Sequence, residues 1–67
     1  MSESLRLELQ ESIEELTTYR ERLRQEIIRI SEKLRMPQKK IESTLAKHLE
    51  LQRIDEVLEQ LIAQRDK

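Results

Sequence analysis

The stretch EKLRMPQKKIES, residues 32–43, contains the only proline of a chain that has no glycine. Pro37 has no amide hydrogen to donate to the carbonyl four residues back, and it disfavours the helical conformation of Met36 before it. Proline is also well suited to be the first residue of a new helix. The stretch therefore predicts that one helix ends near Arg35 and another begins at Pro37. A single kinked helix is the alternative interpretation.

The residues before this stretch carry the apolar pattern of one long helix. Steps of four and three residues alternate without interruption through Leu9, Ile13, Leu16, Arg20, Leu23, Ile27, Ile30 and Leu34. The pattern keeps its phase across Thr17 and Thr18, so we predict a helix over residues 3–35. Arg20 is its one polar member. Either its stem packs while the guanidinium reaches water or a glutamate, or it sets register or selects a partner.

The residues after Pro37 carry two apolar faces instead of one. Ile41, Leu45 and Leu49 share the first face, and Leu51, Ile54, Leu58 and Leu61 form the second. The two faces lie more than 90° apart, counting about 100° per residue. A helix over residues 37–65 therefore contacts two different neighbours or bends near Leu49. A chain that folds back on itself uses both faces, whereas a kinked rod does not.

We thus predict an all-α protein with a single domain over residues 1–67, a hairpin of two long antiparallel helices broken at Met36-Pro37. A 67-residue chain is too small to bury both apolar faces well by itself. Two-helix hairpins commonly pair about a two-fold axis into four-helix bundles. We therefore expect a homodimer whose core and interface are formed by Leu9, Ile13, Leu16, Leu23, Ile27, Ile30, Leu34, Leu51, Ile54, Leu58 and Leu61.

Charge is distributed in three blocks that predict how two copies are oriented. Five glutamates against one arginine give residues 1–19 a net charge of −4, and nine bases against four acids give residues 20–47 a net charge of +5. Five acids against three bases give residues 48–67 a net charge of −2. The hairpin therefore has a basic closed tip and an acidic open end. Copies pointing in opposite directions place each basic tip beside acidic ends, which favours an antiparallel dimer.

The composition argues against an enzyme. There is no cysteine, and the only histidine, His48, has no second nitrogen or sulfur ligand nearby in sequence for a metal. The glutamates stand at helical spacing from basic residues, as solvated ion pairs do. Without glycine there is no phosphate-binding loop. We expect no catalysis, cofactor or metal, and neither a signal peptide nor a membrane-spanning segment. A cytoplasmic protein that binds other proteins is the main hypothesis.

The segment IIRISEKLRMPQKKIESTLAKH resembles the helix-turn-helix of many bacterial DNA-binding proteins. Ile30, Ser31, Leu34, Met36, Ile41, Thr44 and Leu45 match the apolar and small positions of that motif, whereas Arg35 stands where the family has a glycine. The resemblance implies a DNA-binding regulator that uses residues 36–48. In it, Gln38, Lys39, Glu42 and Ser43 would face the major groove, and Lys40 and Lys47 would lie near phosphates.

The segment LQRIDEVL, residues 51–58, is similar to the Ser-Gln-x-Leu-Asp motif of small two-helix phosphatases that act on sporulation response regulators. Gln52, Ile54 and Asp55 match that motif, and Leu51 replaces its serine. The resemblance implies a regulator of response regulators as a remote alternative function. A non-catalytic interaction or adaptor protein, with DNA binding as the second hypothesis, is the function that the sequence favours.

Overall fold

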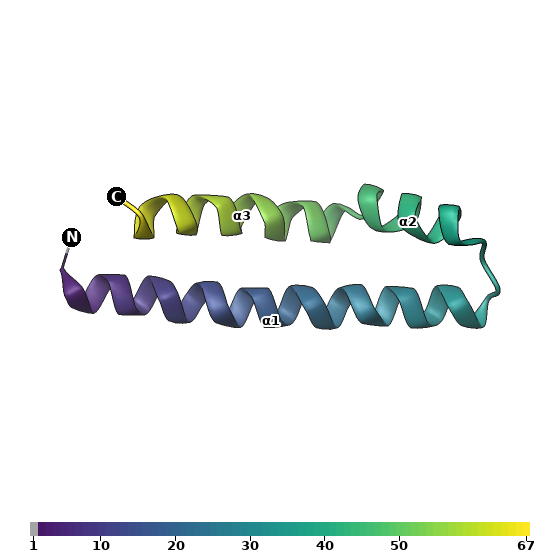
Figure 1. Ribbon diagram of the computed structural model, residues 1–67, viewed down its shortest axis with the longest axis horizontal. Coiled ribbons are helices and arrows are strands. Elements are labelled where there is room, and N and C mark those ends of the chain that lie inside the picture. The colour runs from purple at the N-terminus through teal and green to yellow at the C-terminus, as the bar shows by residue number, and fades with distance from the viewer. Residues whose placement is uncertain (1) are drawn as a thin grey trace.

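The computed structural model describes residues 2–67, and these residues form three helices and no strand. Helix α1 spans Glu3–Lys33, α2 spans Gln38–Lys47 and α3 spans Leu49–Arg65. In Figure 1, α2 and α3 follow one another along the same side of α1, and the start of α1 and the end of α3 lie at the same end of the molecule. The resulting hairpin measures 49 × 16 × 14 Å. The predicted all-α hairpin is confirmed, as a long helix with a shorter, broken return.

Helix α1 begins and ends where its sequence provides capping groups. The side chain of Ser2 accepts a hydrogen bond from the Leu5 amide at 3.2 Å and so caps the first turn. Lys33 in the last turn suits the negative end of the helix dipole. The hydroxyls of Thr17 and Thr18 donate to the carbonyls four residues back, at 2.7 and 3.0 Å. The helix therefore runs through this threonine pair without a break, as predicted.

The turn after α1 is closed by backbone hydrogen bonds. The Met36 amide donates to the Ser31 carbonyl at 3.1 Å, and the Arg35 amide donates to the Glu32 carbonyl at 2.9 Å. This pair of bonds defines a Schellman motif, which places its C′ residue in the left-handed region. That residue is Arg35, with a φ of 57°. Helix α1 therefore ends at Lys33, two residues before the predicted end.

Pro37 lies at the N-cap of α2, one position before the first helical residue where the sequence placed it. Its carbonyl accepts hydrogen bonds from the amides of Lys40 and Ile41 at 2.9 and 3.1 Å. The predicted break at Met36-Pro37 is confirmed, and the single kinked helix is not what forms.

The predicted helix over residues 37–65 is in fact two helices, separated at His48. Its φ and ψ of −70° and 116° are extended, and its Nδ1 accepts a hydrogen bond from the Leu51 amide at 3.4 Å, which caps α3. The extended residue changes the phase of the helix, so that Ile41 and Leu51 are both buried although they lie on different faces of a continuous helix. The bend that the sequence left open therefore exists, one residue before Leu49.

Candidate interaction surface

The core of the hairpin is narrow. Leu9 and Ile13 of α1, Ile41 of α2, and Leu51 and Ile54 of α3 are buried. Among the other predicted core residues, Leu16, Leu23, Ile27, Leu58 and Leu61 are half-buried. No side chain in residues 2–67 is completely enclosed. Ile41, which at 3% exposure is the most deeply buried apolar residue, is not among the predicted core and interface residues.

Two residues that the sequence placed in the core or interface lie outside the core of the single hairpin. Ile30 is 50% exposed and Leu34 is 70% exposed, whereas Ser31 beside them is only 4% exposed. A straight helix drifts about 20° per heptad relative to a seven-residue repeat. The apolar pattern that faces α3 at Leu9 has therefore turned away from the returning chain by Ile30, and Ser31 takes its place.

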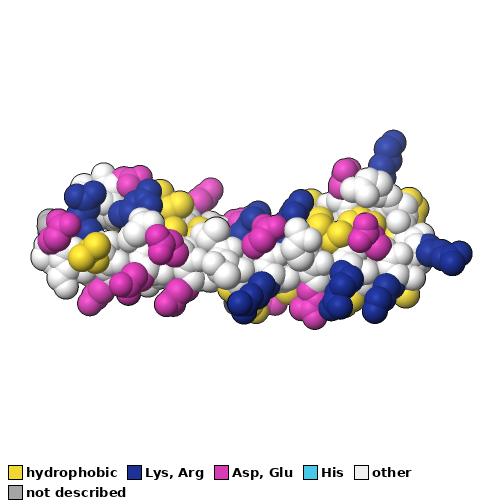
Figure 2. Space-filling model, turned by 60° about the horizontal axis from the view of Figure 1, so that its bottom comes forward, with side chains coloured by type: hydrophobic (Ala, Val, Ile, Leu, Met, Phe, Trp, Pro, Cys, Tyr) yellow, Lys and Arg dark blue, Asp and Glu magenta, His cyan; other side chains and the backbone are white. Residues whose placement is uncertain are grey.

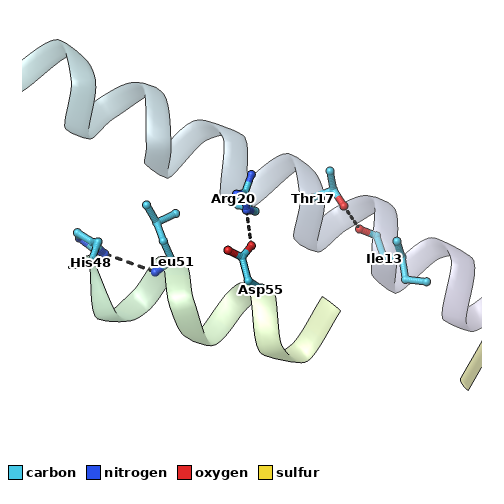
Figure 3. Close-up of polar contacts among 6 residues, drawn as sticks. All are labelled: Ile13, Thr17, Arg20, His48, Leu51 and Asp55. Atoms are coloured by element: carbon cyan, nitrogen blue, oxygen red, sulfur yellow. Dashed lines mark hydrogen bonds and ion pairs between the residues drawn. The ribbon is translucent and has the colours of Figure 1, made fainter. Parts of the chain in front are cut away.

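Three polar contacts link α1 to α3. Arg20 Nε donates to Asp55 Oδ1 at 2.5 Å, and the Tyr19 hydroxyl donates to Glu50 Oε1 at 2.7 Å. Near the open end, Arg65 Nη1 donates to Gln10 Oε1 at 2.8 Å. Figure 3 shows Arg20 and Asp55 extending towards one another from the facing helices. The Arg20 side chain is half-buried and its guanidinium reaches an acidic side chain, as in the first interpretation of Arg20, although the partner is Asp55 and not a glutamate.

Tyr19 is the only tyrosine, and its contact changes its acidity. The hydrogen bond to Glu50, followed by the charge of that carboxylate, raises the pKa of Tyr19 above its ordinary value of 10.0. The phenol remains a donor at neutral pH and joins α1 to the start of α3.

Apolar side chains remain exposed along one side of the hairpin, here termed the apolar flank. Leu5, Tyr19 and Ile30 of α1 and Leu34 at its C-cap are exposed and lie within about 60° of one another at ~100° per residue. Exposed Val57 of α3 belongs to the same side, because it lies two turns after Glu50, which reaches Tyr19. Half-buried Leu16 and Leu23 lie at its inner edge. A shallow groove on this part of α1 contains Tyr19 and Leu23 among side chains that are mostly polar or charged.

Positive charge is concentrated at the closed end, here termed the basic tip, which consists of Lys33, Arg35, Lys39, Lys40 and Lys47. All five side chains are exposed. The ion pairs within residues 2–67 involve Arg20, Arg24 and Arg65, and none involves the basic tip. In Figure 2 the lower edge of the molecule is mostly magenta at the left and mostly dark blue towards the tip at the right.

The residues proposed for DNA contact are all accessible. Gln38, Lys39, Lys40, Ser43 and Lys47 are exposed, as is Glu42, and they belong to α2. Arg35 adopts the positive φ that the helix-turn-helix family obtains with glycine. Helix α2, however, runs back along α1 in Figure 1 and buries Ile41.

The two polar residues that resemble the phosphatase motif are engaged within the chain. Gln52 Nε2 donates to the Ala46 carbonyl at 2.9 Å and so bridges the break at His48. Asp55 forms the ion pair with Arg20. Both side chains lie in exposed residues near the centre of the hairpin.

The described part of the chain contains no group of three or more histidine, cysteine or acidic side chains that could hold a metal ion. None of the helices in residues 2–67 combines the length and hydropathy needed to cross a membrane.

Comparison with known proteins gives a family without an assigned activity. A family model described as "Domain of unknown function (DUF8630)" matches residues 7–67. No curated protein and no solved structure matches the chain. The matched residues include nearly all of α1 and the whole of the return.

Proposed function

We propose that the chain, which belongs to the DUF8630 family, is a non-catalytic interaction module that works as a homodimeric helical bundle and binds a further protein through its outer surface. The observation that carries the proposal is the row of exposed apolar side chains in the apolar flank. Scattered exposed apolar residues are ordinary in soluble proteins, and Leu7, Leu49 and Ile62 are of this kind. The gathering of the other five exposed apolar side chains on one side of a narrow hairpin is typical of an interface.

The accessible surface supports the same proposal. The chain exposes 5542 Å², whereas a compact monomer of its mass exposes about 4,500 Å². The excess is about 1,000 Å², and a standard interface buries about 800 Å² on each partner. Pairing with a second copy therefore removes about as much surface as the hairpin exposes in excess.

Thermal unfolding followed by circular dichroism tests the homodimer. A dimer that unfolds to two separate chains has a midpoint temperature that rises with protein concentration. We expect this rise over a hundredfold range of concentration around micromolar. A cooperative transition with the same midpoint at every concentration would contradict the proposed homodimer.

A pull-down from the source organism with the tagged dimer tests for the further protein. Specific recovery of nucleic acid in place of a protein would contradict the proposed protein binding.

The second candidate function is DNA binding through α2, and the free charges of the basic tip favour it. A gel shift on mixed-sequence duplex DNA at low salt tests this function with Lys39 and Lys40 both changed to Glu. Salt-sensitive binding that this variant loses would support DNA binding, because such binding depends on lysine contacts to phosphates. The matched control changes Arg6 and Arg53, which are exposed and distant from the tip, to Glu. Absence of binding by the unmodified chain would eliminate this function.

A further inference from the structure

We infer that the second copy docks its α1 in antiparallel orientation on α1 of the first, along the apolar flank, with the two-fold axis beside Tyr19. The inference rests on the proposed homodimer and adds the face and the axis. The partner is a second copy of this chain because the apolar pairs and the charge pairs of α1 are each self-complementary about points within one residue of Tyr19.

The apolar residues of α1 are arranged symmetrically around Tyr19. Leu5 precedes Tyr19 by 14 residues and Leu34, the C-cap of α1, follows it by 15, which is about four turns in each direction. Leu16 and Leu23 flank Tyr19 at about one turn on either side. An antiparallel α1 of the second copy therefore places its Leu34 opposite Leu5 and its Leu23 opposite Leu16. The residues that have turned away from the hairpin core become interface residues in this arrangement.

Four charged residues beside the apolar flank specify the antiparallel direction. Glu8, Glu15, Arg22 and Arg29 recur every seven residues, so that they follow one edge of the flank. All four are exposed, and none forms an ion pair within residues 2–67. The antiparallel arrangement places Glu8 opposite Arg29 of the second copy and Glu15 opposite Arg22. A parallel arrangement places Glu on Glu and Arg on Arg, which is unfavourable.

Helix α3 has its own apolar residue at the same level. The Arg20–Asp55 and Gln10–Arg65 contacts place Val57 almost level with Tyr19, and the Tyr19–Glu50 contact places Val57 up to about two turns nearer the open end. Val57 lies on the same flank as Tyr19. A two-fold axis beside Tyr19 therefore has Val57 of both copies near it, on the apolar flank.

Disulfide cross-linking tests the inference cleanly because the chain has no cysteine of its own. Ser12 and Glu26 are exposed on the flank and lie seven residues before and after Tyr19. We expect S12C and E26C proteins, when mixed and oxidised mildly, to form a disulfide-linked dimer of one copy of each. Each variant alone forms none at the same concentration, because its two cysteines are about 21 Å apart along α1.

Other outcomes would overturn the inferred dimer interface, and they show whether the proposed homodimer fails with it. Linked dimers of each variant with itself would show a parallel arrangement. Absence of cross-links in a sample that sediments as a dimer would show that another face pairs, which leaves the proposed homodimer in place. A sample that sediments as a monomer would overturn both proposals. Circular dichroism of both variants confirms that the helices are retained.

Discussion

Arg35 occupies the one backbone conformation in residues 2–67 that favours glycine. Its φ of 57° lies in the left-handed region, where a side chain other than glycine costs about 1–2 kcal/mol. The Schellman hydrogen bonds donated by the amides of Arg35 and Met36 close the turn and offset this cost. The side chain itself is exposed, so nothing in the core depends on it.

Replacing Arg35 with Gly should therefore stabilise the protein. We expect R35G to raise the free energy of unfolding by about 1 kcal/mol, because glycine adopts positive φ without strain. Urea denaturation measures the change. The control is R53G, an exposed position inside α3, where glycine should lower the free energy of unfolding by about 1 kcal/mol. Equal destabilisation by both substitutions would show that residue 35 does not require positive φ.

Tyr19 provides a spectroscopic probe of the contact between α1 and α3. Because Glu50 raises the pKa of Tyr19 above 10.0, the contact stabilises the folded state below pH 10 and is lost as the pH rises through the raised pKa. Ultraviolet absorbance follows the ionisation of this single tyrosine. We expect E50A to lower the pKa of Tyr19 towards its ordinary value. E56A, at an exposed position of α3, is the control, and an identical titration curve for all three proteins would contradict the contact.

Among the helices, the break at His48 allows both apolar faces of residues 37–65, the one with Ile41 and the one with Leu51, to pack against α1. Ile41 is consequently buried, whereas Leu49 is 75% exposed. We expect I41A to lower the free energy of unfolding by about 2–4 kcal/mol through loss of buried contacts. L49A should change it by less than about 0.5 kcal/mol. Denaturation curves of the two variants give the comparison, and a larger effect of L49A would mean that α2 is turned differently against α1.

The elements differ in how far their sequence determines them. The regular spacing from Leu9 to Leu34 predicts the length of α1 to within two residues, and Pro37 predicts the turn. No glycine or proline near His48 predicts the break between α2 and α3. The only sequence signal of this break is that the apolar face containing Ile41 and the one containing Leu51 point in different directions on a continuous helix. That difference allowed a bend or a second neighbour, and tertiary packing against α1 decides between them.

The candidate surface was predicted only in part for a similar physical reason. An apolar heptad pattern identifies residues that prefer burial. It does not indicate which of these residues point away from the neighbouring helix when the helix is straight. The drift that exposes Ile30 and buries Ser31 depends on the actual twist of α1. The ion pair between Arg20 and Asp55 depends on the register of the return, which the sequence does not state. The exposed charges of the basic tip, in contrast, follow directly from the sequence and the turn.

For the whole dimer, reversing the charge of Glu15 or Arg22 tests whether these two residues attract one another across the proposed two-fold axis. E15R alone and R22E alone each create two like-charge pairs in an antiparallel dimer of α1 with α1. An equal mixture of the two forms a dimer with two opposite-charge pairs. Exposed pairs contribute about 0.2–1 kcal/mol each, so we expect each single variant to dissociate several-fold more readily and the mixture to recover.

Fluorescence anisotropy of a labelled chain measures these dissociation constants. The differences should nearly vanish at about 1 M salt, where the screening length is about 3 Å. Weakening by both variants without recovery in the mixture would argue against the pairing of Glu15 with Arg22.

Sedimentation equilibrium at micromolar concentration tests the proposed homodimer most directly. We expect a mass of about twice 8.1 kDa for the unmodified chain. We expect a folded monomer for I30E, whose side chain lies on the apolar flank, and an unchanged dimer for L49E, whose more exposed side chain lies elsewhere. A mass of 8.1 kDa for the unmodified chain, with its helices intact, would contradict the proposed homodimer.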